Sequence, residues 1–217
     1  MELLTNGVGL SVVVFFPLIS AFIITLIPKA QEQLIKGFAL VSSLITFVLS
    51  AVLLFQFDFS SADKLQLGNK ISWIKSINAN YEIGIDGISL PLLVLSTFIT
   101  VLAIIYSIEH LPEPKSPKGF LALILVLETG MNGTFVALDL ILFFVFFEIV
   151  LLPMYFMIGI WGDKTVRTVS GFKNQIETRL YASIKFFVFT LFGSAFMLLG
   201  FLGLYYCLLY TSDAADE

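Results

Sequence analysis

The chain has 217 residues, of which 58% are hydrophobic and only 13% are charged, and its formal net charge at pH 7 is -4. Its 23 phenylalanines exceed what a soluble core of this size needs, so the composition excludes a soluble globular domain and predicts a polytopic helical membrane protein. The sequence shows no basic stripe that would suit nucleic acid. The single cysteine, Cys207, lies in an apolar segment and indicates nothing about the redox compartment.

The first half of the chain contains three apolar segments long enough to cross a bilayer, which takes about 20 residues. They cover residues 8–27, 37–57 and 88–108. The first has no basic leader and no small-residue cleavage site, which favours a retained helix over a signal peptide. Residues 58–87 contain alternating apolar and polar side chains and a Gly68-Asn69 pair. This pattern predicts a small extended or hairpin layer on the membrane surface, with a turn at that pair.

The second half begins with an apolar stretch, residues 119–161, about twice as long as one crossing, so it must fold back on itself. Asp139 is a residue type that caps helix N-termini, and a turn there gives spans at residues 119–138 and 140–161. A polar connector leads to a sixth apolar segment, residues 185–208, whose glycines suit close helix packing. The predicted fold class is therefore all-α: a polytopic bundle of six transmembrane helices with a small extended or hairpin segment at the outer surface.

The domain organisation follows from these spans. Residues 1–210 form one transmembrane domain, whereas residues 211–217 end an apolar helix with a polar composition that suits neither a loop nor another span. We expect this tail to reflect an incomplete or artefactual reading frame. Three of the 12 Lys and Arg residues lie within residues 58–87, and the other nine lie in the loops on the opposite side. The bias places those loops in the cytoplasm and both ends of the six-span unit outside.

The fifth predicted span carries a carboxylate, Glu148, near its middle. A charge at bilayer mid-depth costs at least ~2.5 kcal/mol, so an acid there indicates proton or ion handling. Pro153 leaves the carbonyl of Ile149 without its helical donor, which predicts a kink or a hydration point beside the acid. The alternative is a neutral, hydrogen-bonded Glu148 that only ties helices together.

A second carboxylate, Glu128, lies 11 residues before Asp139, and Glu148 lies nine after it. At ~1.5 Å per residue both would be roughly 13 to 16 Å from the turn, on adjacent antiparallel helices. If they face each other, repulsion and burial would hold a proton on the pair, but the sequence leaves their orientation open. Thr129 and Asn132 could hydrogen-bond Glu128, so a structural role and a functional role both stay open for it.

The remaining polar residues give weaker predictions. His110, beside Glu109 at the end of the third span, could relay protons at the membrane surface or be only an interfacial histidine. No His, Cys or carboxylate cluster has metal-ligand spacing, so no metal site is predicted. No glycine-rich loop follows a strand, so we expect neither a catalytic residue nor an NADH, flavin or iron–sulfur site in this chain.

Several short strings carry a resemblance to one family. They are GIDGISL at residues 84–90, ALDL at 137–140, FFVFFE at 143–148, PMYF at 153–156, WG at 161–162 and KFF at 185–187. Together they resemble subunit M, the antiporter-like chain 4 type of membrane subunit in the proton-pumping NADH:quinone oxidoreductase, respiratory complex I. The resemblance covers residues 16–204. It implies a non-redox translocase subunit of an enzyme complex, in which other subunits bind NADH, flavin, iron–sulfur clusters and quinone.

In that family the acid of the fifth helix pairs with a lysine of the seventh, and their coupled charges gate proton passage. The resemblance gives this role to Glu148. Family members have about fourteen helices, so the six spans would form the N-terminal part, and repeats that involve the other helices would not be visible here. The implied partners are other membrane subunits, especially antiporter-like ones, in a bacterial plasma (inner) membrane. Two further functions stay open: a subunit of a multisubunit sodium/proton antiporter, and an inactive truncated fragment.

Overall fold

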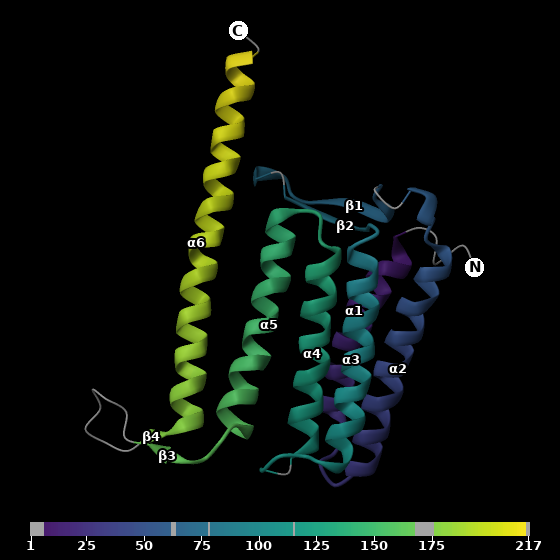
Figure 1. The fold of residues 1–217 in the computed structure, drawn as a ribbon, viewed down its shortest axis with the longest axis vertical. Helices are drawn as coiled ribbons and strands as arrows, with labels where there is room; N and C mark the ends of the chain where they lie inside the picture. Colours follow the sequence, from purple (N-terminus) through teal and green to yellow (C-terminus); the bar gives the residue numbers. More distant parts are fainter. Residues whose placement is uncertain (1–6, 62–63, 78, 115, 168–175, 216–217) are drawn as a thin grey trace.

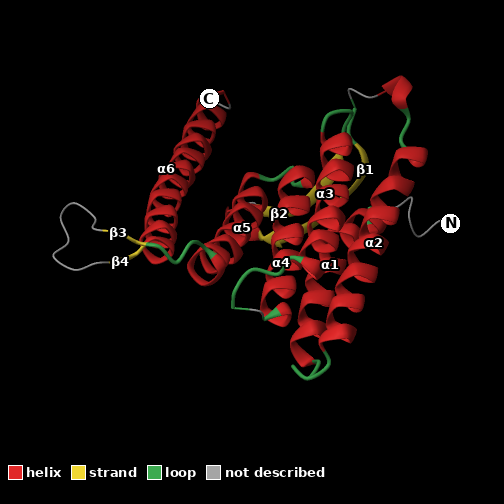
Figure 2. Ribbon diagram, turned by 60° about the horizontal axis from the view of Figure 1, so that its bottom comes forward, coloured by secondary structure: helices red, strands yellow, loops and turns green. Residues whose placement is uncertain are grey.

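The computed structural model describes residues 7–215 except 62–63, 78, 115 and 168–175. Its six long helices are α1 (Val8–Leu26), α2 (Glu32–Gln56), α3 (Ser89–Glu109), α4 (Pro117–Val136), α5 (Leu140–Trp161) and α6 (Thr178–Ala215). All six are long and apolar enough to cross a membrane, which confirms the predicted all-α membrane class. Helices α1 to α4 pack together, α5 lies beside α4, and α6 lies beyond α5 (Figures 1 and 2).

Two helices begin earlier than hydropathy predicts. α2 begins at Glu32 instead of residue 37, and α6 begins at Thr178 instead of residue 185. The extra turns contain charged side chains, which a helix end accommodates because long side chains reach back to water. α6 also continues to Ala215, so most of the polar tail is helical in the structure, and residues 216–217 lie outside the described range.

The segment between α2 and α3 is an antiparallel hairpin, as predicted, in which β1 (Gln66–Ile74) pairs with β2 (Ala79–Ile85). The predicted turn at Gly68-Asn69 is wrong. This pair lies within β1 at a register shift, next to Leu67 with a φ of 52°, and the reversal between the paired Ile74 and Ala79 includes the short 3-10 helix Lys75–Ile77. Glycine and asparagine suit a bulge as well as a turn, so the local sequence could not separate the two.

Three smaller elements complete the described chain. A 3-10 helix, Phe59–Ser61, precedes the β1–β2 hairpin, which covers one end of the bundle, hereafter the hairpin end (Figure 1). At the opposite end, β3 (Val166–Arg167) pairs with β4 (Ile176–Glu177) before α6 begins. The loops between α1 and α2 and between α3 and α4 lie at that same opposite end (Figure 1).

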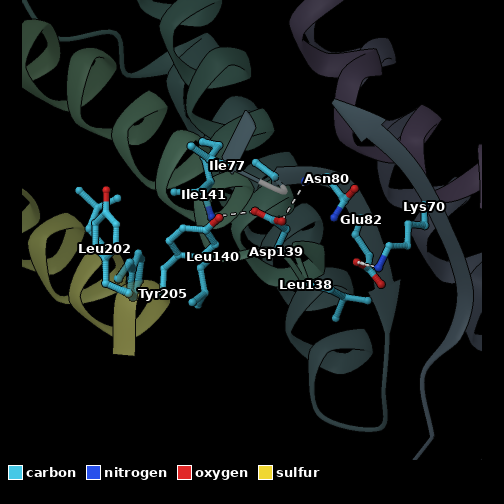
Figure 3. A pocket seen from close by; sticks show the side chains of 13 residues that line it. Lys70, Ile77, Asn80, Glu82, Leu138, Asp139, Leu140, Ile141, Leu202 and Tyr205 are labelled. Carbon is cyan, nitrogen blue, oxygen red and sulfur yellow. Dashed lines mark hydrogen bonds and ion pairs between the residues drawn. The ribbon is translucent and has the colours of Figure 1, made fainter. Parts of the chain in front are cut away.

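Asp139 joins the hairpin to the turn between α4 and α5. Its Oδ1 accepts hydrogen bonds from the amides of Ile141 and Leu142, at 2.8 and 3.1 Å, and so caps α5. Its Oδ2 accepts a bond from the amide of Asn80 at 2.9 Å (Figure 3). One carboxylate therefore positions both the first turn of α5 and strand β2.

The core of the bundle has three layers. One apolar cluster fills the hairpin end and includes Leu10, Leu53, Leu93 and Val136. A second fills the opposite end and includes Ile24, Ile35, Ile104 and Leu125. Between them along α1 to α4 lies a band of buried polar side chains, here called the polar layer, comprising Ser20, Ser42, Ser43, Thr46, Ser50, Ser96, Thr97, Thr100, Glu128, Thr129 and Asn132.

Candidate functional site

Glu128 lies within the polar layer and is 0% exposed. Neither of its carboxyl oxygens makes a hydrogen bond to a described residue. One turn along α4, the Oδ1 of Asn132 accepts a bond from the Oγ of Ser96 on α3, at 3.3 Å. Because residues four apart share a helix face, this contact indicates that Glu128 lies on the side of α4 that faces α3.

Glu148 lies on the side of α5 that meets α6. Tyr155 and Gly159 share its helix face, seven and eleven residues further on. The ring of Tyr155 is 5.2 Å from that of Phe187, and a Cβ added at Gly159 would be 3.3 Å from the Oγ of Ser183. Glu148 is half-buried, and its Oε1 is buried without a hydrogen bond to any described residue.

The contacts between α5 and α6 also indicate what lies opposite Glu148. Tyr155 is level with Phe187, and α5 and α6 run antiparallel. Seven residues back along α5 and seven residues forward along α6, Ser194 therefore lies level with Glu148. Ser194 is buried, and its Oγ donates to the carbonyl of Leu191 at 3.0 Å. The nearest described Lys or Arg along these two helices is Lys185, nine residues or about 13 Å from Ser194.

The two carboxylates have similar depths but do not face each other. α4 and α5 meet at Gly130, where an added Cβ would be 3.1 Å from the amide nitrogen of Val150 and 3.2 Å from the carbonyl oxygen of Phe146. Glu128 is two residues from Gly130, and Glu148 is two residues from both Phe146 and Val150. At about 100° per residue, each carboxylate is turned roughly 160 to 200° away from the contact between the helices.

The structure does not bring the other candidates to either carboxylate. His110 is exposed at the end of α3, stacked on Tyr106 with ring centroids 4.7 Å apart. It is ten residues, or about 15 Å, along α3 from Thr100, which is at the depth of Glu128. Pro153 is buried within α5, and the helix continues through it. Within the described part of the chain, no three His, Cys, Asp or Glu side chains gather as metal ligands would.

A surface cavity of about 370 Å³ lies beside Asp139 at the hairpin end, between the hairpin, α5 and α6. Figure 3 shows the ion pair between Lys70 and Glu82 at its wall, with nitrogen and oxygen 2.7 Å apart. Asp139 is nine residues, or about 13 Å, along α5 from Glu148. The cavity is therefore separate from both buried acids.

The polar layer was missed as a unit by the sequence reasoning. Its signal was present, since Ser42, Thr46 and Ser50 recur every four residues within one apolar span. Ser96 and Thr100 repeat the same spacing in α3. Residues four apart share a helix face, so both sets could have been expected to line the inside of the bundle.

The fold and its buried acids define a class, the polytopic integral membrane proteins that carry uncompensated carboxyl groups within a helix bundle. A family profile described as NADH-ubiquinone oxidoreductase chain 4, amino terminus, matches residues 12–134. A second, described as NADH:quinone oxidoreductase/Mrp antiporter, TM, matches residues 137–211. The chain belongs to the family of NADH-quinone oxidoreductase subunit M, also called chain 4.

Three curated relatives illustrate the family. The NADH-ubiquinone oxidoreductase chain 4 of Marchantia polymorpha is 36% identical over 91% of this chain and 37% of its own length. The F420H2 dehydrogenase subunit M of Methanosarcina mazei is 36% identical over 90% of this chain and 36% of its own length. The NADH-quinone oxidoreductase subunit M of Rickettsia typhi is 35% identical over 90% and 38%. The chain thus spans less than two fifths of the length of these relatives.

A solved structure supports the fold. A chain of the membrane-bound sulfane sulfur reductase, an archaeal respiratory membrane complex, superposes with a TM-score of 0.68. The two chains are 22% identical, and the match covers 90% of this chain and 36% of the other. The six-helix arrangement therefore has a counterpart in a known membrane respiratory complex.

Proposed function

We propose that this chain is a proton-translocating membrane subunit of an NADH:quinone oxidoreductase, respiratory complex I. It performs no redox chemistry and handles protons by changing the charge on Glu148. The observation that carries the proposal is the placement of Glu148, whose Oε1 is buried on the face of α5 that meets α6 and has no hydrogen-bond partner among the described residues. Inserting an ionisable side chain at that depth costs free energy, and acids found there usually take part in ion or proton pathways.

The relatives support a division of labour between subunits. Two of them carry the names of complexes with different electron sources, NADH and F420H2, although both are 36% identical to this chain. A membrane module that is separate from the electron input would serve either complex. We therefore place NADH, flavin, iron–sulfur clusters and quinone in other subunits, which supply the energy, with neighbouring antiporter-like subunits as membrane partners.

A charge change on Glu148 requires a cation to act against. α5 contains no Lys or Arg, and Lys185 of α6 is about 13 Å away along the helix. The relatives extend well beyond the length that this chain covers. We propose that the partner is a lysine from a later helix of the full-length protein, as the family resemblance implies.

The test of this function measures proton translocation and electron transfer together, in vesicles that carry the assembled complex with either the wild-type chain or Glu148→Gln. The proposal requires that proton translocation falls while the complex still assembles. If translocation stays at the wild-type level, Glu148 does not handle protons.

The proposed orientation places residues 28–36, 109–118 and 163–183 in the cytoplasm, because those loops hold most of the Lys and Arg. Single cysteines can be introduced at exposed positions in a chain that carries Cys207→Ser. An impermeant thiol reagent added outside the cell should label Ser72→Cys in β1 but not Ala30→Cys or Lys164→Cys. Labelling of Lys164→Cys from outside would reverse the orientation and the proposed placement of both termini outside a bacterial plasma membrane.

Glu128 is expected to matter less than Glu148 for pumping. It lies in the enclosed polar layer, turned away from the α5–α6 side, and a neutral glutamine has nearly its shape and hydrogen-bonding capacity. Glu128→Gln in the full-length chain should therefore keep most quinone-linked proton pumping. A loss as deep as that of Glu148→Gln, measured in the same vesicles, would instead support a working pair of carboxylates.

A sodium/proton antiporter subunit is the second candidate. It is favoured by the family profile over residues 137–211, which contains Glu148 and names the Mrp antiporter beside NADH:quinone oxidoreductase. Gene neighbours distinguish the two, since oxidoreductase subunits on either side favour the pump and small antiporter subunits favour exchange. The full-length reading frame tests the remaining alternative, an inactive truncated chain.

A further inference from the structure

The polar layer contains three groups that no described residue satisfies. They are both carboxyl oxygens of Glu128, the Nδ2 of Asn132 and the Oγ of Ser42. All three residues are at most 2% exposed, and apolar clusters close the layer toward both ends of the bundle. Buried polar atoms are normally hydrogen-bonded, so these groups require a partner.

Glu128 and Asn132, which carry two of these unsatisfied groups, lie one turn apart on the same face of α4. The hydrogen bond between Ser96 and Asn132 fixes the register of α3 against the antiparallel α4. Four residues forward along α3 and four residues back along α4, Thr100 is therefore level with Glu128. The hydroxyls of Thr46 and Thr100 donate to carbonyls of their own helices, at 3.1 and 3.0 Å. Their lone pairs remain available as acceptors toward the inside of the layer.

α1 supplies a further acceptor. The Nζ of Lys118, near the start of α4, donates to the carbonyl of Ile27, just past the end of α1, at 2.7 Å. The two helices are antiparallel, so ten residues back along α1 and ten residues forward along α4 bring the buried Pro17 level with Glu128. Pro17 has no amide hydrogen, and the carbonyl of Val13 therefore lacks the helical donor that it would otherwise have four residues further on. Val13 is one turn nearer the hairpin end, level with the unsatisfied amide of Asn132.

The chemistry of this set selects its ligand. The polar layer contains no Lys, Arg or His, and burying an unpaired carboxylate costs far more than burying a neutral carboxylic acid, so Glu128 keeps its proton. The set then contains donors, the Glu128 hydroxyl and the Asn132 amide, as well as acceptors. A water molecule donates and accepts, making about three bonds in such sites. A metal ion would satisfy only the acceptors and would leave the Asn132 amide unpaired.

We propose that the polar layer is a closed binding site for ordered water, held between protonated Glu128, the Asn132 amide and the hydroxyls and free carbonyl that face them. The site is separate from Glu148, which lies across the α4–α5 contact on the other side of α5. The water connects α1, α2, α3 and α4 through hydrogen bonds that the side chains do not make directly. This inference stands whether or not Glu148 translocates protons.

The first test is a double-mutant cycle in the full-length chain within its complex. Glu128→Leu and Asn132→Leu should each lower the thermal midpoint, because each leaves the partner groups of the water unpaired. The double variant should lose clearly less than the two single losses combined, since it removes the paired donors and acceptors together. Losses that simply add would overturn the proposal.

The second test does not depend on how well the leucine variants fold. Infrared spectra of the complex should contain a carbonyl band of a protonated carboxylic acid that disappears in Glu128→Gln, whereas Asp139→Asn, at the half-buried cap of α5, serves as a control that keeps it. A high-resolution map of the complex should show water bonded to both Glu128 and Asn132. An ionised Glu128, or a thermal midpoint that rises with sodium concentration in wild type but not in Glu128→Gln, would identify a cation site instead.

Discussion

Glu148→Gln in an intact complex is expected to assemble normally and to lose most proton translocation. Glutamine keeps the shape and hydrogen bonding of the acid but can never be charged, so the step in which Glu148 changes its charge cannot occur. We expect a loss of about tenfold or more, which corresponds to at least ~1.4 kcal/mol on the limiting barrier. Assembly, electron transfer and proton uptake are measured on the same vesicles.

Glu148→Asp is the matched variant. Aspartate still ionises, so it should keep part of the pumping, although the shorter side chain places the carboxylate about one bond away from its partners. A purely structural Glu148 predicts the reverse order, with a nearly silent glutamine and a harmful aspartate. Glutamine activity close to wild type would reject the proton-carrier role. The 217-residue chain by itself should show no proton flux, because the described part of the chain places no Lys or Arg beside Glu148 for its charge to act against.

Gly130→Ala is expected to destabilise the bundle, whereas the same added methyl group at a described helical glycine that faces open space is not. The added Cβ would be 2.6 Å from the Cγ2 of Val150 and 3.1 Å from its backbone nitrogen, so α4 and α5 must move apart. Such overpacking typically costs about 1 to 3 kcal/mol and is sometimes worse when backbone must shift. One turn away, the ring of Phe146 already covers Gly133, which limits how the helices can adjust.

Gly37→Ala is the control for this prediction. Nothing lies within 4 Å of a Cβ added at Gly37, which is also helical. Because alanine is the better helix former, Gly37→Ala should be neutral or stabilising by roughly 0.5 to 1 kcal/mol. The two variants are compared by thermal unfolding and by the yield of assembled complex. Equal midpoints would show that the close approach of α4 and α5 at Gly130 can relax without cost.

The residues at which the long helices begin and end follow from the amino-acid sequence more closely than the position of the hairpin turn does. The turn at Asp139 was placed within a 43-residue apolar stretch, and the structure ends α4 at Val136 and begins α5 at Leu140. Alternation alone predicts the hairpin, but it also predicts a turn at Gly68-Asn69, where the structure has a register shift within β1. A pair of small residues permits a bulge and a turn alike, and only the pairing of Gln66 with Ile85 decides between them.

The number of membrane-spanning helices and the depth of each acid could be predicted from the amino-acid sequence, because hydropathy and a fixed rise per residue are properties of a single helix. It could not determine the rotation of each helix about its axis. That rotation depends on which surfaces pack, and here Gly130 meets the backbone of Phe146 and Val150. Only the tertiary structure therefore placed Glu128 inside the polar layer and turned Glu148 toward α6. Two acids at one depth became two separate sites because small residues, and not the acids, occupy the contact between their helices.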